Sequence, residues 1–104
     1  MTAKLFLDDI RLCPDGYILV RNYDDCITLL ENGIFEEVSL DYSLGYGQKT
    51  GYDVLVWLDK HREHLPKKIN IHSTYPFGVH QMSNYIKAHF PEVELLPYRE
   101  KMDC

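Results

Sequence analysis

Three aspartates and one histidine of this chain each follow a short apolar run at the point where that run ends. Asp8 and Asp9 come after residues 4–7, Asp41 after residues 36–40, and His72, followed by Ser73, after residues 68–71. Carboxylates are hard oxygen ligands of the kind that Mg²⁺ binds while it keeps several waters. Crowded acids also repel one another, and a cation would relieve that cost. The pattern favours a Mg²⁺ or Mn²⁺ site at Asp8, Asp9 and Asp41 over simple capping of loops and helices.

Three further groups near the predicted cation could act on a phosphate. The imidazole of His72 could protonate an alkoxide leaving group near neutral pH, and the alternative is a histidine that is hydrogen-bonded to a loop carbonyl. The guanidinium of Arg11 could bind a phosphate in bidentate fashion or pair with the neighbouring acids. Ser73 could steady a phosphate oxygen or cap the turn before Pro76. Each of these side chains therefore has a functional and a structural interpretation.

The elements that must position these residues can be located from apolar periodicity, caps and turns. Strands are expected at residues 4–8, 17–21, 36–41, 68–72 and 93–96. Helices are expected from residue 23 to the end signal at Gly33, from Gly51 to about His64, and from the turn at 75–78 to Phe90, with a polar tail after residue 96. Asn22 with Asp25, and Thr50 with Asp53, have the spacing of helix caps. Asp53 is therefore interpreted as a cap rather than a ligand.

The alternation of strands and helices from residue 17 onward is typical of an α/β protein with a parallel sheet. Ligands of open α/β sheets bind at the carboxyl ends of the strands, so the acids and His72 are expected to meet at that edge. We predict a compact flavodoxin-like fold with a five-stranded, mainly parallel sheet of order 2-1-3-4-5. The 104 residues are expected to form a single domain, residues 1–104.

The connection between the first two strands is too short for a helix. It contains about seven loop residues, whereas a parallel crossover normally needs ~12 or more. Seven extended residues reach ~23–25 Å, just enough to return from the top of the sheet to the bottom. We therefore expect the first crossover helix to be reduced or missing and one face of the sheet to be thinly covered. A short antiparallel second strand is the competing layout.

Composition limits the classes of partner. The formal net charge of −5 argues against an extended nucleic-acid footprint but allows contact with a single RNA end. Six basic residues gather at the end of the sheet opposite the acids, where they complement a helix dipole: Lys60, His61, Arg62, His64, Lys67 and Lys68. The 3 cysteines form no paired motif, and no apolar run is long enough to span a bilayer. A cytoplasmic protein without membrane association is expected.

Four tyrosines flank the predicted site on loops: Tyr42, Tyr46, Tyr52 and Tyr75. Aromatic rings at such positions could stack on a nucleic-acid base. They could equally form a surface for a protein partner or pack as a lid. The sequence leaves these alternatives open.

At its acidic motifs the chain resembles response-regulator receiver domains, and more closely a compact branch of that fold, the cyclic-phosphate processing receiver-like domain. The resemblance is carried by residues 5–11 (LFLDDIR), 39–41 (SLD), 50–58 (TGYDVLVWL), and His72-Ser73 with Pro76, Gly78 and Met82. It implies that the carboxylates hold Mg²⁺, that Asp41 corresponds to the phosphoryl acceptor, and that Ser73 or Thr74 is the hydroxyl residue after the fourth strand. Polar family positions are occupied here by Tyr42, Ser43, Tyr75 and Val79, and the lysine of signalling receivers is not evident.

Residues and resemblance together predict metal-dependent processing of phosphoesters, on cyclic phosphates or RNA ends. The expected roles are catalysis by Asp41 and His72, substrate binding by Arg11, Ser73 and Thr74, and metal binding by Asp8, Asp9 and Asp41. A cyclic phosphodiesterase or phosphohydrolase is the enzymatic form of this prediction, with a phosphorylated small molecule or an RNA terminus as its substrate. The alternatives are a signalling receiver that accepts phosphate on Asp41, and a binding module that has kept the fold and lost catalysis.

Overall fold

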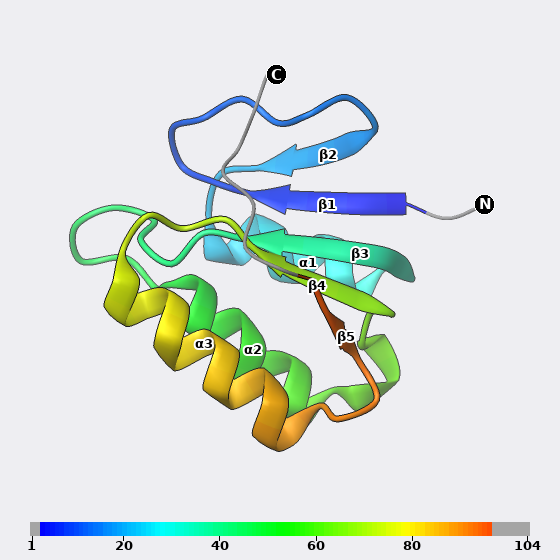
Figure 1. Ribbon diagram of the computed structural model, residues 1–104. Helices are drawn as coiled ribbons and strands as arrows, with labels where there is room; N and C mark the ends of the chain where they lie inside the picture. Colours follow the sequence, from blue (N-terminus) through cyan, green and yellow to red (C-terminus); the bar gives the residue numbers. More distant parts are fainter. Residues whose placement is uncertain (1–2, 97–104) are drawn as a thin grey trace.

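The computed structural model describes residues 3–96 (Figure 1). Its elements are β1 (Ala3–Leu7), β2 (Tyr17–Val20), α1 (Tyr23–Glu31), β3 (Phe35–Leu40), α2 (Gly51–Lys60), the short 3-10 helix η1 (Arg62–His64), β4 (Lys68–Ile71), α3 (Pro76–His89) and β5 (Glu94–Leu95). Each predicted strand and helix is present near its expected position. The predicted polar tail lies outside the described residues.

The five strands form one sheet of order β2-β1-β3-β4-β5, and all four pairings are parallel. The predicted α/β fold and strand order are confirmed. The competing antiparallel second strand is wrong, because Lys4 to Leu7 pair in parallel with Tyr17 to Val20. The connection at residues 8–16 contains no helix, as its length predicted.

The three longer helices, α1, α2 and α3, pack side by side in one layer, α1 on α2 and α2 on α3 (Figure 1). Parallel crossovers are almost always right-handed. The chain moves in one direction across the sheet from β2 to β3, β4 and β5, so all three crossover helices lie on one face. Only the step from β1 to β2 runs the other way, and that step has no helix. Within the described residues, the second face of the sheet is therefore without helices.

The core lies between the sheet and this helix layer. Alternate strand residues point to opposite faces, and one set supplies the apolar layer: Leu5, Leu7, Val38, Leu40, Ile69 and Ile71, all at most 2% exposed. The helices meet it with buried residues of their own: Cys26, Leu30, Val54, Leu55, Leu58, Met82 and Ile86. The other set of alternate residues, which includes Phe6, Ser39 and Asn70, lies on the opposite face of the sheet, the face that also carries the site described below.

The helix ends follow local hydrogen bonding. The Asn22 side chain accepts from the Asp25 N–H at 2.8 Å, and the Asp53 carboxylate accepts from the Thr50 N–H at 2.8 Å, so both predicted caps are confirmed. The predicted end of α2 near His64 is wrong, because the helix ends at Lys60. There the imidazole Nδ1 of His61 donates to the Trp57 carbonyl at 2.9 Å and replaces a backbone bond of the last turn.

We find no helix among residues 3–96 that combines the length and the apolar character needed to cross a membrane.

Candidate functional site

Strand register brings the predicted site residues together. Phe6 on β1, Ser39 on β3 and Asn70 on β4 lie side by side across the sheet. Two residues further on, the next side chains on the same face are those of Asp8, Asp41 and His72. Backbone bonds continue the ladder beyond the strand ends, from the Asp41 N–H to the Leu7 carbonyl at 3.1 Å and from the His72 N–H to the Leu40 carbonyl at 3.0 Å. The predicted meeting of these groups at the carboxyl edge is thereby explained.

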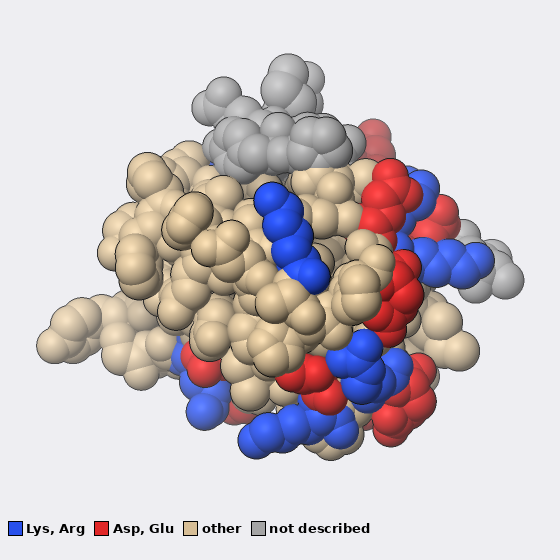
Figure 2. All heavy atoms as spheres, turned by 60° about the horizontal axis from the view of Figure 1, so that its bottom comes forward, with Lys and Arg blue, Asp and Glu red and all other residues tan. Residues whose placement is uncertain are grey.

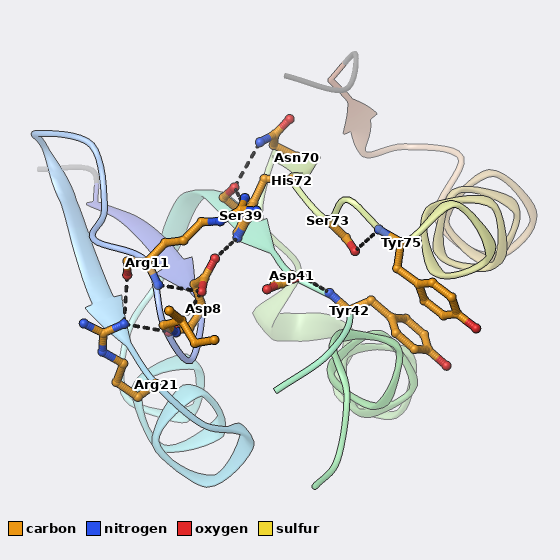
Figure 3. A network of polar contacts seen from close by, with 11 residues as sticks. Asp8, Arg11, Arg21, Ser39, Asp41, Tyr42, Asn70, His72, Ser73 and Tyr75 are labelled. Atoms are coloured by element: carbon orange, nitrogen blue, oxygen red, sulfur yellow. Dashed lines mark hydrogen bonds and ion pairs between the residues drawn. The ribbon is translucent and has the colours of Figure 1, made fainter. Parts of the chain in front are cut away.

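Asp8, Asp41 and His72 form a compact donor group. One ligand atom from each lies within 4.8 Å of the others, and no other group of three histidine, cysteine or acidic residues among the described residues does so. Figure 3 shows Asp8 and His72 bonded to each other with Asp41 beside them. Asp9, predicted as a third carboxylate ligand, is not part of this group. Its charge nevertheless acts on Asp41.

The Asp8 carboxylate is buried, with 1% of the residue exposed. Its Oδ1 accepts from the backbone N–H groups of Ile10 and Arg11, both at 2.9 Å. Burial by itself would raise the pKa of Asp8, but these two bonds and the interactions with His72 outweigh it and lower the pKa below the ordinary 3.8. Asp8 is therefore a charged acceptor held in a fixed orientation, because the loop after β1 folds back onto it.

Asp41 has the opposite electrostatic environment. Burial, followed by the charge of Asp8, raises its pKa to about 6, and the N–H of Tyr42 and the charge of Arg11 oppose this only in part. The Tyr42 N–H donates to Oδ1 at 2.7 Å. No described residue donates to Oδ2, so this oxygen can bind a cation. Two carboxylates at one site, one of them with a raised pKa, are the electrostatic signature of a site that a divalent cation would stabilise.

A chain of buried side chains leads to Asp8 from within the sheet (Figure 3). The Asn70 Nδ2 donates to Ser39 Oγ at 3.0 Å, Ser39 Oγ lies 2.8 Å from His72 Nδ1, and His72 Nε2 lies 3.1 Å from Asp8 Oδ2. Because the carboxylate can only accept, His72 donates from Nε2. The Ser39 hydroxyl, which accepts from Asn70, can then donate to Nδ1. The donor order thus runs from Asn70 to Asp8 and fixes the His72 ring.

The His72 ring is further held by packing. It stacks on Phe6 with ring centroids 4.1 Å apart, and only 1% of the residue is exposed. Since β3 lies between β1 and β4, the stack spans the small side chain of Ser39. Both ring nitrogens contact protein groups, Nδ1 the Ser39 hydroxyl and Nε2 the Asp8 carboxylate, so His72 is placed to hold Asp8 in a fixed orientation. The predicted role of His72 as an acid toward a leaving group stays a prediction.

Sequence reasoning missed Ser39, Asn70 and Arg21. The signal for the first two was present, because a serine and an asparagine interrupt otherwise apolar strands and align with Asp41 and His72 at a spacing of two. Arg21 had no comparable signal. Its guanidinium donates to the backbone carbonyls of Arg11 at 2.8 Å and Asp8 at 3.3 Å and thereby fixes the loop after β1 (Figure 3).

The predicted phosphate-binding residues lie at the rim of the acidic group. Arg11 is part-exposed, and its charge acts on Asp41. The Ser73 hydroxyl accepts from the Tyr75 N–H at 3.1 Å, which confirms its role in the turn and leaves its own hydrogen available to a ligand. Thr74 is exposed beside it.

The four loop tyrosines do not form a single surface. Tyr42 and Tyr75 adjoin one another, with ring centroids 5.5 Å apart, and both point away from the acids (Figure 3). The Tyr42 ring lies against Gly78, where an added Cβ would come within 2.4 Å of it. Tyr52 instead packs edge-on against Tyr85 at 5.2 Å, and Tyr46 is fully exposed. Only Tyr42 and Tyr75 are therefore placed to act together.

We expect Gly51→Ala to lower the free energy of unfolding by about 2–3 kcal/mol, the cost of forcing extra volume into a packed core. A Cβ at position 51 would lie 2.0 Å from the carbonyl oxygen of Asp41 and 3.2 Å from the sulfur of Met82. Gly33→Ala is the matched control, because its Cβ would meet Phe35 at an ordinary 3.5 Å. Urea unfolding measures both variants. Equal losses would contradict a specific requirement for glycine at position 51.

A known protein family matches the part of the chain that contains the candidate site. The family model described as cyclic-phosphate processing receiver domain matches residues 3–88, which include the acids, His72 and the residues at the rim. Among proteins with curated descriptions, none matches the sequence.

Proposed function

This chain belongs to the family of cyclic-phosphate processing receiver domains, and on that premise we propose that it processes cyclic phosphates or RNA ends in a metal-dependent reaction. The observation that carries the proposal is the donor group of Asp8, Asp41 and His72, whose ligand atoms lie within 4.8 Å of one another at the carboxyl edge of the sheet. A phosphoester is the substrate class that such a site suits, because acidic metal sites act on phosphate oxygens.

The donor set fits a hard divalent cation. Asp8 and Asp41 offer carboxylate oxygens, and burial, followed by the charge of Asp8, disfavours the charged form of Asp41, which a bound cation would offset. We assign these two residues as the ligands of Mg²⁺ or Mn²⁺, with Asp9 as a ligand through water. When bound, the cation would polarise the phosphate and neutralise charge that develops on it.

The remaining residues bind and orient the substrate. Arg11 and Ser73 donate to phosphate oxygens at the rim, and Thr74 extends this donor set outward. His72 holds Asp8 in place through its Nε2 bond. Protonation of the departing ribose oxygen is assigned to His72 or to a water at the rim.

Asp41 has a second role open to it, as the nucleophile. In that route its carboxylate attacks phosphorus, one ribose oxygen leaves and takes up a proton, and the phosphorus stays bonded to the other ribose oxygen. Water then hydrolyses the bond between Asp41 and phosphorus, which frees the carboxylate and leaves a phosphomonoester. The same step would underlie a signalling receiver, whose acceptor is the corresponding aspartate. Treatment with beryllofluoride and Mg²⁺ tests this role directly, since an adduct at Asp41 supports attack by the carboxylate and its absence favours attack by water.

The decisive assay uses 2′,3′-cyclic mononucleotides and oligoribonucleotides that end in a cyclic phosphate, each with Mg²⁺ or Mn²⁺. We expect conversion to phosphomonoesters by the wild type and a loss of at least about 100-fold in Asp8→Asn and Asp41→Asn, on the scale of removing one preorganised charged group. Asp15→Asn, a change on the exposed part of the loop between β1 and β2, should be unaffected. If none of these substrates is turned over, the proposed enzymatic function is wrong, and the alternative of a binding module without catalysis replaces it.

A further inference from the structure

A groove runs along α3 from the rim of the acidic site. It has a volume of about 650 Å³ and is lined at its near end by Ser73 and Thr74. The rest of its lining is a stripe along the helix: Pro76, Val79, His80, Ser83, Asn84 and Lys87. Because these positions recur every three or four residues, they share one side of α3. The groove therefore begins at Ser73 and Thr74, the two residues that follow His72 in the chain, and runs from there along α3.

The groove is longer than one nucleotide. Positions 76 and 87 are separated by 87 − 76 = 11 residues of α3, which is roughly 16 Å at about 1.5 Å per residue. Stacked nucleotides are spaced by about 3.4 Å along a strand. The volume also lies inside the range of roughly 300–1,000 Å³ that small-molecule sites occupy. A single cyclic nucleotide bound at the acidic site would leave most of this groove empty.

The described part of the lining carries one lysine, one histidine and no acidic residue. Lys87 and His80 are its ionisable groups among the described residues, and no acidic side chain lines it there. The remaining polar residues offer hydroxyl and amide groups, and the Asn84 amide lies 3.1 Å from His80 Nε2 and orients that ring. Figure 2 looks onto α2 and α3 and shows a broad surface of uncharged residues with the acids gathered toward its edges. A polyanion in this groove would therefore meet Lys87 and no carboxylate among the described lining residues.

We propose that this groove binds the RNA strand that precedes a terminal cyclic phosphate, so that the substrate is a polynucleotide end rather than a free cyclic nucleotide. Lys87 contacts a backbone phosphate, and the exposed imidazole of His80 stacks on or hydrogen-bonds to a base, as aromatic side chains do in single-strand recognition. This inference rests on the proposed function, because the acidic site must hold the terminal phosphate while the groove holds the strand.

A binding measurement without turnover tests the groove. The probe is a fluorescent oligoribonucleotide that ends in an unreactive 3′-phosphate. We expect Lys87→Met to weaken its binding about 3–10-fold and to reduce the slope of log affinity against log salt by about 0.7, the value for one phosphate contact on a single strand. Lys60→Met, at the exposed end of α2, is the matched control and should change neither quantity. Equal affinity and equal slope in Lys87→Met and the wild type would overturn the proposal.

Turnover separates this proposal from the function on which it rests. For the wild type we expect kcat/KM on a cyclic-ended oligoribonucleotide to exceed that on the cyclic mononucleotide about 10-fold, and we expect Lys87→Met to remove this preference while Lys60→Met keeps it. Turnover without any preference would overturn the groove and leave the proposed function. Binding that depends on Lys87 without any turnover would overturn the proposed function and leave the groove as an RNA-binding site.

Discussion

Asp41→Asn is expected to raise the melting temperature of the metal-free protein at pH 7 by roughly 5–15 °C. In the folded state the pKa of Asp41 is raised to about 6 from an ordinary 3.8, so the folded state favours the protonated carboxyl. Two pKa units correspond to about 3 kcal/mol, and part-exposure of the side chain reduces this to about 1–2 kcal/mol. The amide keeps the bond from the Tyr42 N–H and lacks the charge.

Because the pKa of Asp41 is raised on folding, the stability gained in Asp41→Asn depends on pH. Well below the ordinary pKa of 3.8 the carboxyl is protonated in both the folded and the unfolded state, and the variant gains nothing. As the pH rises through 6, Asp41 ionises next to Asp8, and the full cost of the charge appears. Thermal melts with a chelator between pH 4 and 8 should therefore show wild type and variant converging at the acid end. A difference in melting temperature that does not depend on pH would contradict the conclusion that burial and the charge of Asp8 disfavour ionised Asp41.

Divalent metal should invert this order of stability. We expect Mn²⁺ or Mg²⁺ to raise the melting temperature of the wild type in proportion to its occupancy, because a ligand that binds only the folded state stabilises it. Asp41→Asn should lose most of this response. If metal leaves the wild type unchanged at millimolar concentration, the two carboxylates are an unrelieved repulsive pair, and the proposed metal-dependent reaction loses its basis.

The parallel sheet and the meeting of the acids could be predicted because both follow from local pattern. Short apolar runs mark buried strands, and the polar residue after each run marks the edge where ligands bind. The missing helix followed from chain length alone, since the loop before Tyr17 is too short to contain one. The orientation of β2 was left open because a tight reversal and an extended crossover require similar numbers of residues.

The internal support of the site could not be predicted from the same pattern. Ser39 and Asn70 sit within strands, where single polar residues carry little weight in an apolar run, and their partners are 33 and 31 residues away in sequence. Only the register of β3 against β4 places them side by side. The contribution of Arg21 is a contact between a guanidinium and two loop carbonyls, which depends on loop conformation and leaves no periodic trace.

Replacing His72 with alanine is expected to cost about 3 kcal/mol or more of unfolding free energy. The change removes a buried ring stacked on Phe6 and leaves Asp8 as a buried charge without its imidazole partner. Truncation of a buried aromatic side chain and loss of the hydrogen-bond partner of a buried charged group both contribute to a cost of this size. Urea unfolding measures the loss. His80→Ala, on the exposed side of α3, should change stability by less than about 0.5 kcal/mol.

His72→Gln separates the two roles of this histidine. The glutamine amide can place an N–H donor close to the position of His72 Nε2 and bond to Asp8, but it cannot transfer a proton to a leaving group. If His72 orients Asp8, the glutamine variant should recover at least about half of the stability lost in His72→Ala and also restore the Mn²⁺ response and part of the turnover. If stability and metal response return while turnover stays at the level of the alanine variant, His72 is the proton donor of the reaction.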